Sequence, residues 1–166
     1  MEADTELLNK CFIKSYKEES KRNPNFGCRK MSSREWWKSV VWNTFSEAEV
    51  CKEKLGEKFE EIFSDLYHGF SKVDKWKFFE DVKPVILSLK AKGVKMGVIS
   101  NNDDRLLELL KEANLSGYFE FVLVSADLGF MKPQQVFFTL LFLFFEGYKM
   151  TLKKHFFFEG NLCACT

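Results

Sequence analysis

The sequence predicts an α/β protein in which an all-helical segment precedes an incomplete parallel sheet. In residues 1–78, apolar side chains recur at helical spacing, and no strand-like alternation interrupts them. From Asp81 onward, helix-like and strand-like stretches alternate with short loops, a pattern typical of parallel β-α-β units with right-handed crossovers. We therefore expect two parts, a helical segment at 1–78 and a partial α/β core at 79–166.

The first part is expected to be built from helices. They are expected at about residues 4–21, from Ser32 or Ser33 to Phe45, 47–55 and 57–69. The break after the first helix is the Asn-Pro-Asn-Phe-Gly stretch at 23–27, whose residues favour turns. The second helix has aromatic residues on its apolar face, which we interpret as the core of this segment. The alternative is a surface that docks a partner or a second copy of the chain, formed by Trp36, Trp37, Trp42 and Phe45.

The second part has the alternation of a parallel sheet. A helix is expected at 82–92 with Gly93 as its C-terminal cap, followed by a strand at 94–100. That strand, VKMGVIS, is a continuous apolar run of the kind that is buried on both faces. The next helix and strand are expected at 105–113 and 119–125, with two aspartates as the acidic start of the helix.

The composition excludes several classes of protein. Lys and Arg total 25 against 24 Asp and Glu, which argues against nucleic-acid binding and against a membrane-surface role. The five cysteines form no Cys-x-x-Cys pair, and only two His are present, so a zinc site is not expected. The polar N-terminus does not resemble a signal peptide, and the longest apolar run is too short to span a bilayer. We expect an intracellular protein, of the cytoplasm or the nucleus.

The C-terminal stretch is rich in phenylalanine and lacks periodicity. Its apolar runs lie at 136–145 and 155–158. Two interpretations are open: these runs cover apolar faces of the incomplete sheet, or they form an unselected segment appended to it. The lack of periodicity favours the second.

Polar residues follow each expected strand at one edge of the sheet. Ser100 ends the first strand, Asn101 begins the turn, and Lys132 with Pro133 closes the loop after the second strand. Ligands of open parallel sheets bind at the carboxyl ends of the strands, and free amides at a helix start favour an anion. A hydroxyl, backbone amides and a lysine at this place predict binding of a phosphate or another tetrahedral anion. Taken singly, the serine is a common helix cap and Lys-Pro a common solvated turn.

These stretches resemble the haloacid dehalogenase-like hydrolase superfamily. The stretch at 98–110, VISNNDDRLLELL, is similar to its second motif, and that at 128–137, LGFMKPQQVF, to its third. The double Trp within SSREWWKSVVWNTF resembles the helical cap of one subgroup. The resemblance implies a Rossmann-like core, phosphatase-type transfer from a small phosphorylated substrate, and a phosphate site formed here by Ser100, Asn101 and Lys132.

The chain departs from the family pattern where catalysis is concerned. The family's nucleophile lies in an Asp-x-Asp motif on a first strand, and no Asp-x-Asp occurs in these 166 residues. The fourth motif, which binds Mg²⁺ in the family, is reduced to Glu159 as a weak metal candidate. Gln134 and Gln135 replace Asp-Pro in the third motif, which is expected to loosen the lysine loop.

These departures lead us to expect no catalytic residue and no cofactor in this chain, and so an inactive member of a hydrolase family. The alternatives are a non-catalytic interaction module and a truncated product without activity. The expected ligand is a small phosphorylated molecule, with self-association through the aromatic surface as a further expectation.

Overall fold

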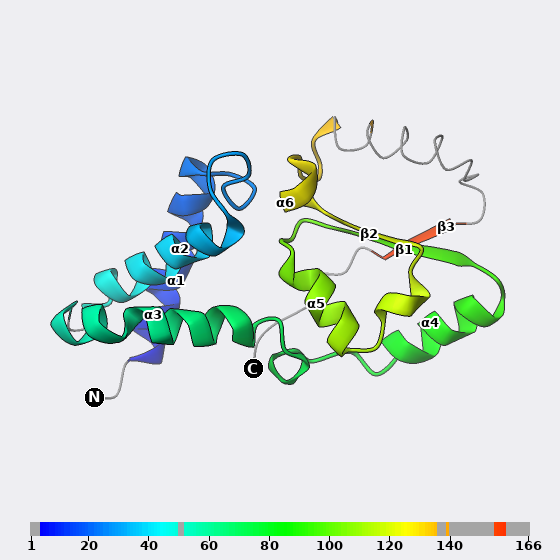
Figure 1. Cartoon of the computed structure of the whole chain (residues 1–166), viewed down its shortest axis with the longest axis horizontal. Coiled ribbons are helices and arrows are strands. Elements are labelled where there is room, and N and C mark those ends of the chain that lie inside the picture. Colours follow the sequence, from blue (N-terminus) through cyan, green and yellow to red (C-terminus); the bar gives the residue numbers. More distant parts are fainter. Residues whose placement is uncertain (1–3, 50–51, 136–138, 140–154, 159–166) are drawn as a thin grey trace. The chain divides into compact units, whose positions relative to one another are not determined.

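The chain folds into two compact units, Met1–Gly69 and Phe70–Thr166 (Figure 1). The computed structural model describes residues 4–49, 52–135, 139 and 155–158. The division follows Gly69, whereas the sequence pattern places it after residue 78. Residues 70–78 belong with the second unit because their backbone bonds there: the Val73 N–H donates to the Glu112 carboxylate over 3.1 Å.

The helical unit consists of α1 (Thr5–Arg22), α2 (Ser33–Glu47) and α3 (Lys52–Gly69). Asp4 caps α1, since its carboxylate accepts the N–H of Glu6 over 2.9 Å. A reciprocal capping box opens α2: the Ser32 hydroxyl accepts the Glu35 N–H, and the Glu35 carboxylate accepts the Ser32 N–H. Of the two serines, Ser32 is therefore the cap. Its backbone N–H and then its hydroxyl, both donating to Glu35, lower the pKa of that carboxyl.

The two helices expected at 47–55 and 57–69 are wrong as separate elements. Residue 47 ends α2, and α3 continues from Lys52 through Gly56 to Gly69. An exposed glycine inside a helix costs about 1 kcal/mol relative to alanine, which is small beside the burial of one helix face. Phe59, Phe63 and Tyr67 form that buried face of α3.

Aromatic side chains form most of the interior of the helical unit. Trp36 is 1% exposed and meets the rings of Tyr16, Phe26 and Trp37 edge to face, with Trp37 at 5.0 Å between centroids. Trp42 lies at the margin, 38% exposed, with its ring against that of Phe59. Trp36 is therefore a core residue, as interpreted from the sequence, whereas Trp42 belongs to the core only in part. A docking role for them stays a prediction.

The second unit is α/β. Its elements are α4 (Val82–Ala91), β1 (Lys95–Ser100), α5 (Arg105–Glu112), β2 (Phe121–Val124), α6 (Ser125–Leu128) and β3 (His155–Phe158), with single 3-10 turns at Val73–Lys75 and Ser116–Tyr118. The strand order is β2-β1-β3, and both pairings of β1 are parallel. This confirms the predicted α/β fold with an incomplete parallel sheet that follows a helical segment.

The aromatic run at 155–158 has a place in this sheet. As β3 it pairs with β1 along the edge opposite β2, from Lys95 with His155 to Val98 with Phe158. Backbone groups of Lys95 to Val98 on that edge of β1 thereby gain partners, which an unpaired strand would leave open. The sequence pattern favoured an unselected segment and missed this strand, because four aromatic residues show no periodicity. The run at 136–145 lies outside the described residues, apart from Thr139.

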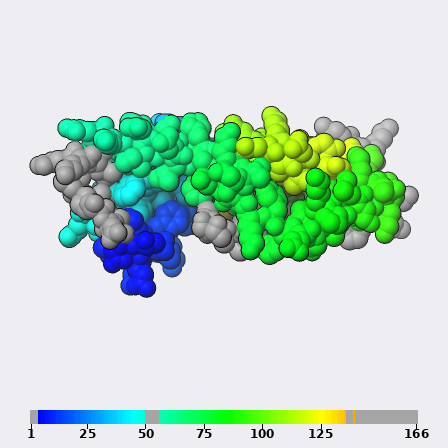
Figure 2. Space-filling view, turned by 90° about the horizontal axis from the view of Figure 1, so that it is seen from below, coloured from blue at the N-terminus to red at the C-terminus, as the bar shows by residue number. Residues whose placement is uncertain are grey.

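The core of the α/β unit lies between the sheet and the helices α4 and α5. Its buried members are Ile86, Met96, Leu106, Leu109, Leu110, Leu115 and Val124. Residues that lead into α4, together with α4 itself, form much of the surface of this unit in Figure 2 (green), and Phe79, Val85 and Leu87 are exposed apolar residues of this stretch. Gly93 follows α4 with a left-handed φ of 71°, as the predicted cap requires. In the described part of the chain, no helix combines the length and the apolar character that crossing a membrane requires.

Candidate functional site

The candidate site lies at the carboxyl ends of β1 and β2. Ser100 is the last residue of β1 and pairs in register with Val124, the last residue of β2. The loops that follow the two strands therefore begin at the same edge of the sheet. Ser100 is half-buried there, and Asn101, the next residue, is exposed.

Lys132 returns to this edge from the loop after α6. Its backbone N–H donates to the Asn101 side-chain oxygen over 2.8 Å, and its carbonyl oxygen accepts the Asn101 side-chain N–H over 2.9 Å. Its ammonium nitrogen lies 3.4 Å from the carbonyl oxygen of Ile99. The structure thus brings together Ser100, Asn101 and Lys132, the three residues that the sequence indicated, while their binding of phosphate stays a prediction.

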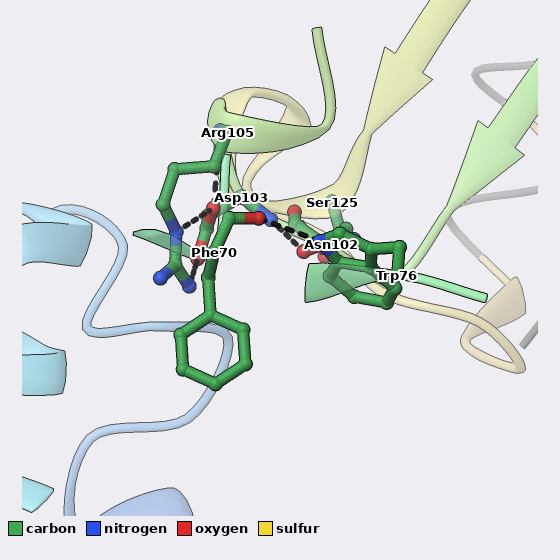
Figure 3. Close-up of polar contacts among 6 residues, drawn as sticks. All are labelled: Phe70, Trp76, Asn102, Asp103, Arg105 and Ser125. Atoms are coloured by element: carbon green, nitrogen blue, oxygen red, sulfur yellow. Dashed lines mark hydrogen bonds and ion pairs between the residues drawn. The ribbon is translucent and has the colours of Figure 1, made fainter. Parts of the chain in front are cut away.

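Two further bonds join the turn after β1 to the start of α6. The Asn102 carbonyl oxygen accepts the Ala126 N–H over 3.2 Å. It also accepts the Ser125 hydroxyl over 3.4 Å (Figure 3). Ser125 is fully buried. Ser125 was not among the residues expected at the site, although a serine at the end of an apolar strand is the same signal that singled out Ser100.

Asp103 has a different role from the one expected. It is 0% exposed, and Arg105 holds both its carboxylate oxygens, with Nε donating over 2.9 Å and Nη2 over 2.7 Å (Figure 3). The side chain of Arg105 is 12% exposed. This bidentate pair ties the turn after β1 to the start of α5. The same view shows the Trp76 indole N–H donating to the carbonyl oxygen of Phe70 over 2.8 Å, in the segment that leads into this unit.

The start of α5 offers fewer free amides than the sequence suggested. The Asp103 N–H donates to the Asn102 side-chain oxygen over 2.9 Å, and the Arg105 N–H to the Asp103 carboxylate over 3.1 Å. The expectation of free amides is therefore wrong for these two residues. An anion at this edge would depend chiefly on Ser100 and Lys132.

The helix start is also acidic. Removal from water, and then the charge of Asp103, raise the pKa of Asp104 above its ordinary value, and the charge of Asp127 adds a smaller increase. Negative charge thus gathers on the α5 side of the site, while Lys132 supplies positive charge from the other loop. An anion would accordingly be held on the Lys132 side.

Gln134 closes the loop that contains Lys132. Its side-chain oxygen accepts the Met131 N–H over 3.0 Å, and its own N–H donates to the Met131 carbonyl oxygen over 2.9 Å. The glutamine that replaces the family's aspartate thus makes two bonds across Lys132 and Pro133. These two bonds restrain the loop, in contrast to the loosening that the sequence led us to expect.

The described residues do not fit the Mg²⁺ that the family resemblance implies. Among them, no three side chains of His, Cys, Asp or Glu are grouped in a way suited to a metal ion. Both oxygens of Asp103 are engaged by Arg105, so this carboxylate is not available as a ligand. Glu159, the weak candidate from the sequence, lies outside the described residues.

Comparisons with known proteins agree with the sequence motifs. The family model for haloacid dehalogenase-like hydrolases matches residues 4–143. A haloacid dehalogenase-like hydrolase domain-containing protein 3 of Danio rerio is 34% identical over 129 residues, or 77% of this chain and 52% of its own length. The Homo sapiens protein of the same name is 31% identical over 134 residues, 80% of this chain and 52% of its own length. These are members of the subgroup that the double Trp indicated.

A more distant relative has an enzymatic name. A phosphoglycolate phosphatase of Aquifex aeolicus is 33% identical over 85 residues, which is 51% of this chain and 39% of that protein. The chain spans about half the length of the domain-containing protein 3 relatives that it matches. With the family model matching most of its length, the chain belongs to the haloacid dehalogenase-like hydrolase family.

Proposed function

We propose that this chain binds a small phosphorylated ligand at the carboxyl end of β1 and does not hydrolyse it unaided. One observation supports the binding above all: the Lys132 ammonium lies 3.4 Å from the Ile99 carbonyl oxygen, one residue from the Ser100 hydroxyl. A cation and a hydroxyl from two successive β-α units thus converge at one edge of the sheet. Their chemistry suits a tetrahedral oxyanion.

The class of ligand is supported by the comparison with relatives. Among them is a protein named phosphoglycolate phosphatase, whose name specifies a small phosphate ester. A phosphate monoester offers anionic oxygens to both Ser100 and Lys132. Because the start of α5 is acidic, we expect the rest of the ligand to extend away from Asp104.

The absence of hydrolysis is proposed on chemical grounds. Family hydrolysis proceeds through attack by an aspartate of an Asp-x-Asp motif, and these 166 residues contain no such motif. Asp103 is the carboxylate next to the turn after β1, and its engagement by Arg105 leaves it unsuited to attack phosphorus. The site formed by Ser100 and Lys132 would bind the phosphate but would not supply a nucleophile.

Calorimetric titration of the 166-residue chain with inorganic phosphate tests the binding. Lys132→Ala and Ser100→Ala should each weaken affinity, Lys132→Ala by on the order of tenfold or more, because a hydrogen bond to a charged group contributes about 1.5–3 kcal/mol. Lys90→Ala and Ser88→Ala, exposed on α4, are the matched controls and should leave affinity unchanged. Equal affinities in all five proteins would refute the proposed site.

Hydrolysis of an aryl phosphate, with and without Mg²⁺, tests the second half of the proposal. We expect no turnover above the background of the Ser100→Ala, Lys132→Ala double variant. Turnover that the double variant abolishes would show that another residue acts as nucleophile. That result would overturn the inactivity and leave the binding site intact.

A further inference from the structure

We infer that Asn101 is a positioning residue for Lys132, and that its side chain holds the lysine loop instead of binding the anion. The inference rests on the proposed function, since it concerns how the cation of that site is placed. It changes the role expected from the sequence, where Asn101 was a member of the phosphate-binding set.

The geometry is a two-point contact with a single residue. The side-chain amide of Asn101 donates to the Lys132 carbonyl oxygen over 2.9 Å and accepts the Lys132 N–H over 2.8 Å. Both distances are those of good hydrogen bonds. One planar amide thus pairs with both polar groups of one backbone residue, 31 positions away in the sequence. The contact sets the position and the direction of the backbone from which the lysine side chain extends.

Positioning matters here because the lysine side chain is long and flexible. Its ammonium lies near the Ile99 carbonyl oxygen only if the backbone of residue 132 stays beside the end of β1. The bond from Ala126 N to Asn102 O holds the loop after β2 at its beginning, and Gln134 closes the turn at its far side. Between these points, the two hydrogen bonds of the Asn101 side chain join the Lys132 backbone to the turn after β1.

The amide is the group that this contact needs. A donor and an acceptor must lie side by side on a short side chain, which asparagine provides. A carboxylate would present two acceptors, one of them against the Lys132 carbonyl oxygen. An alanine would leave both polar groups of Lys132 to water and release the loop.

A double-mutant cycle on sulfate affinity separates positioning from direct binding. Sulfate is the probe because its charge stays constant near neutral pH. We expect Asn101→Ala to weaken sulfate binding about fivefold to tenfold in the native chain, within the range of coupled neighbours. In the Lys132→Ala background, Asn101→Ala should have no further effect. If Asn101 acted only through general stability, or bound the sulfate directly, the two substitutions would change the free energy of sulfate binding additively. An additive result therefore overturns the inference.

The contact itself has a separate readout in amide hydrogen exchange. The Lys132 N–H should exchange faster in Asn101→Ala than in the native chain, and at the native rate in Ser100→Ala. Gln135→Ala, at an exposed amide residue that directly follows this loop, is the matched control and should change neither exchange nor sulfate affinity. Unchanged exchange in Asn101→Ala would overturn the inference. If the native chain binds neither sulfate nor phosphate, the proposed function fails and this inference with it, whereas binding with an additive cycle refutes the inference alone.

Discussion

The two units use buried polar side chains differently. In the helical unit, Thr44 and Glu19 bond within their own helix or at its end: the Thr44 hydroxyl donates to Val40 O over 2.8 Å, and Glu19 accepts from Asn23 over 2.7 Å. The buried Trp36 bonds further away, to Asn23 O over 2.7 Å, and so joins α2 to the end of α1. In the α/β unit, the buried Ser125 bonds across 23 positions of sequence to Asn102, at the end of the sheet. The long-range bond of the helical unit thus joins two helices, whereas that of the α/β unit joins the segments that follow two strands. The unit with bonds between strand ends is the one in which a binding site is proposed.

The largest effect is expected from the core of the helical unit. Trp36→Ala removes a buried ring and its hydrogen bond to Asn23 O, so the free energy of unfolding should fall by about 3–5 kcal/mol. Urea unfolding measures this, and sulfate affinity at low urea should be unchanged if the two units are functionally separate. Trp42→Ala, at a half-exposed position, should cost clearly less. Equal losses for the two tryptophans would contradict the distinction between core and margin.

The next effect concerns the buried ion pair beside the site. Asp103→Asn leaves the guanidinium of Arg105 without its charge partner, so the free energy of unfolding should fall by about 3 kcal/mol. Sulfate affinity should rise, because a negative charge beside the site is removed. The double variant Asp103→Asn, Arg105→Gln removes the unpaired charge and should recover part of the stability. Chemical unfolding measures the stability and calorimetry the affinity. A stability loss with unchanged affinity would separate this pair from the site.

A smaller effect is expected from the cap of α2. Ser32→Ala should lower the free energy of unfolding by about 1 kcal/mol, because the Glu35 N–H loses its acceptor. The pKa of Glu35 is lower in the folded state than in the unfolded state. The ionised carboxyl therefore stabilises the fold at pH values above its unfolded pKa. This stabilisation disappears as the pH falls through the pKa of the folded state. Unfolding measured across acidic pH should show less of this loss in the variant. An unchanged pH dependence would exclude the Ser32 hydroxyl as a cause and leave the Ser32 backbone N–H, which the variant retains.

The smallest effect should have the opposite sign. The pKa of Asp104 is higher in the folded state than in the unfolded state. The protonated carboxyl therefore contributes stability below the unfolded pKa, and this contribution is lost as the pH rises through the pKa of the folded state. Asp104→Asn should therefore raise the melting temperature slightly at pH 7, and the gain should vanish below about pH 3, where the carboxyl is protonated in both states. Sulfate affinity at pH 7 should also rise. A variant that melts lower at pH 7 would contradict this assignment.

The sequence by itself determined the local elements of this protein. Helical periodicity, the serine cap of α2, the apolar run of β1 and the glycine after α4 all act within a few residues, so their signals are visible in the chain. The family motifs likewise placed Ser100 and Lys132 at the ends of successive β-α units. The two helices expected at 47–55 and 57–69 show the limit of local signals, because α3 is one continuous helix from Lys52 to Gly69.

Only the tertiary structure decided which distant groups meet. The pairing of β3 with β1 depends on backbone hydrogen bonds, for which a run of aromatic residues has no signature. The amide of Asn101 and the backbone of Lys132 are 31 positions apart, and either residue alone is typical of a solvated turn. Asp103 likewise looks like an ordinary helix start until Arg105 is seen to hold it in the interior. Side-chain direction and burial depend on the packing of the whole unit, and that packing places the cation beside the end of β1.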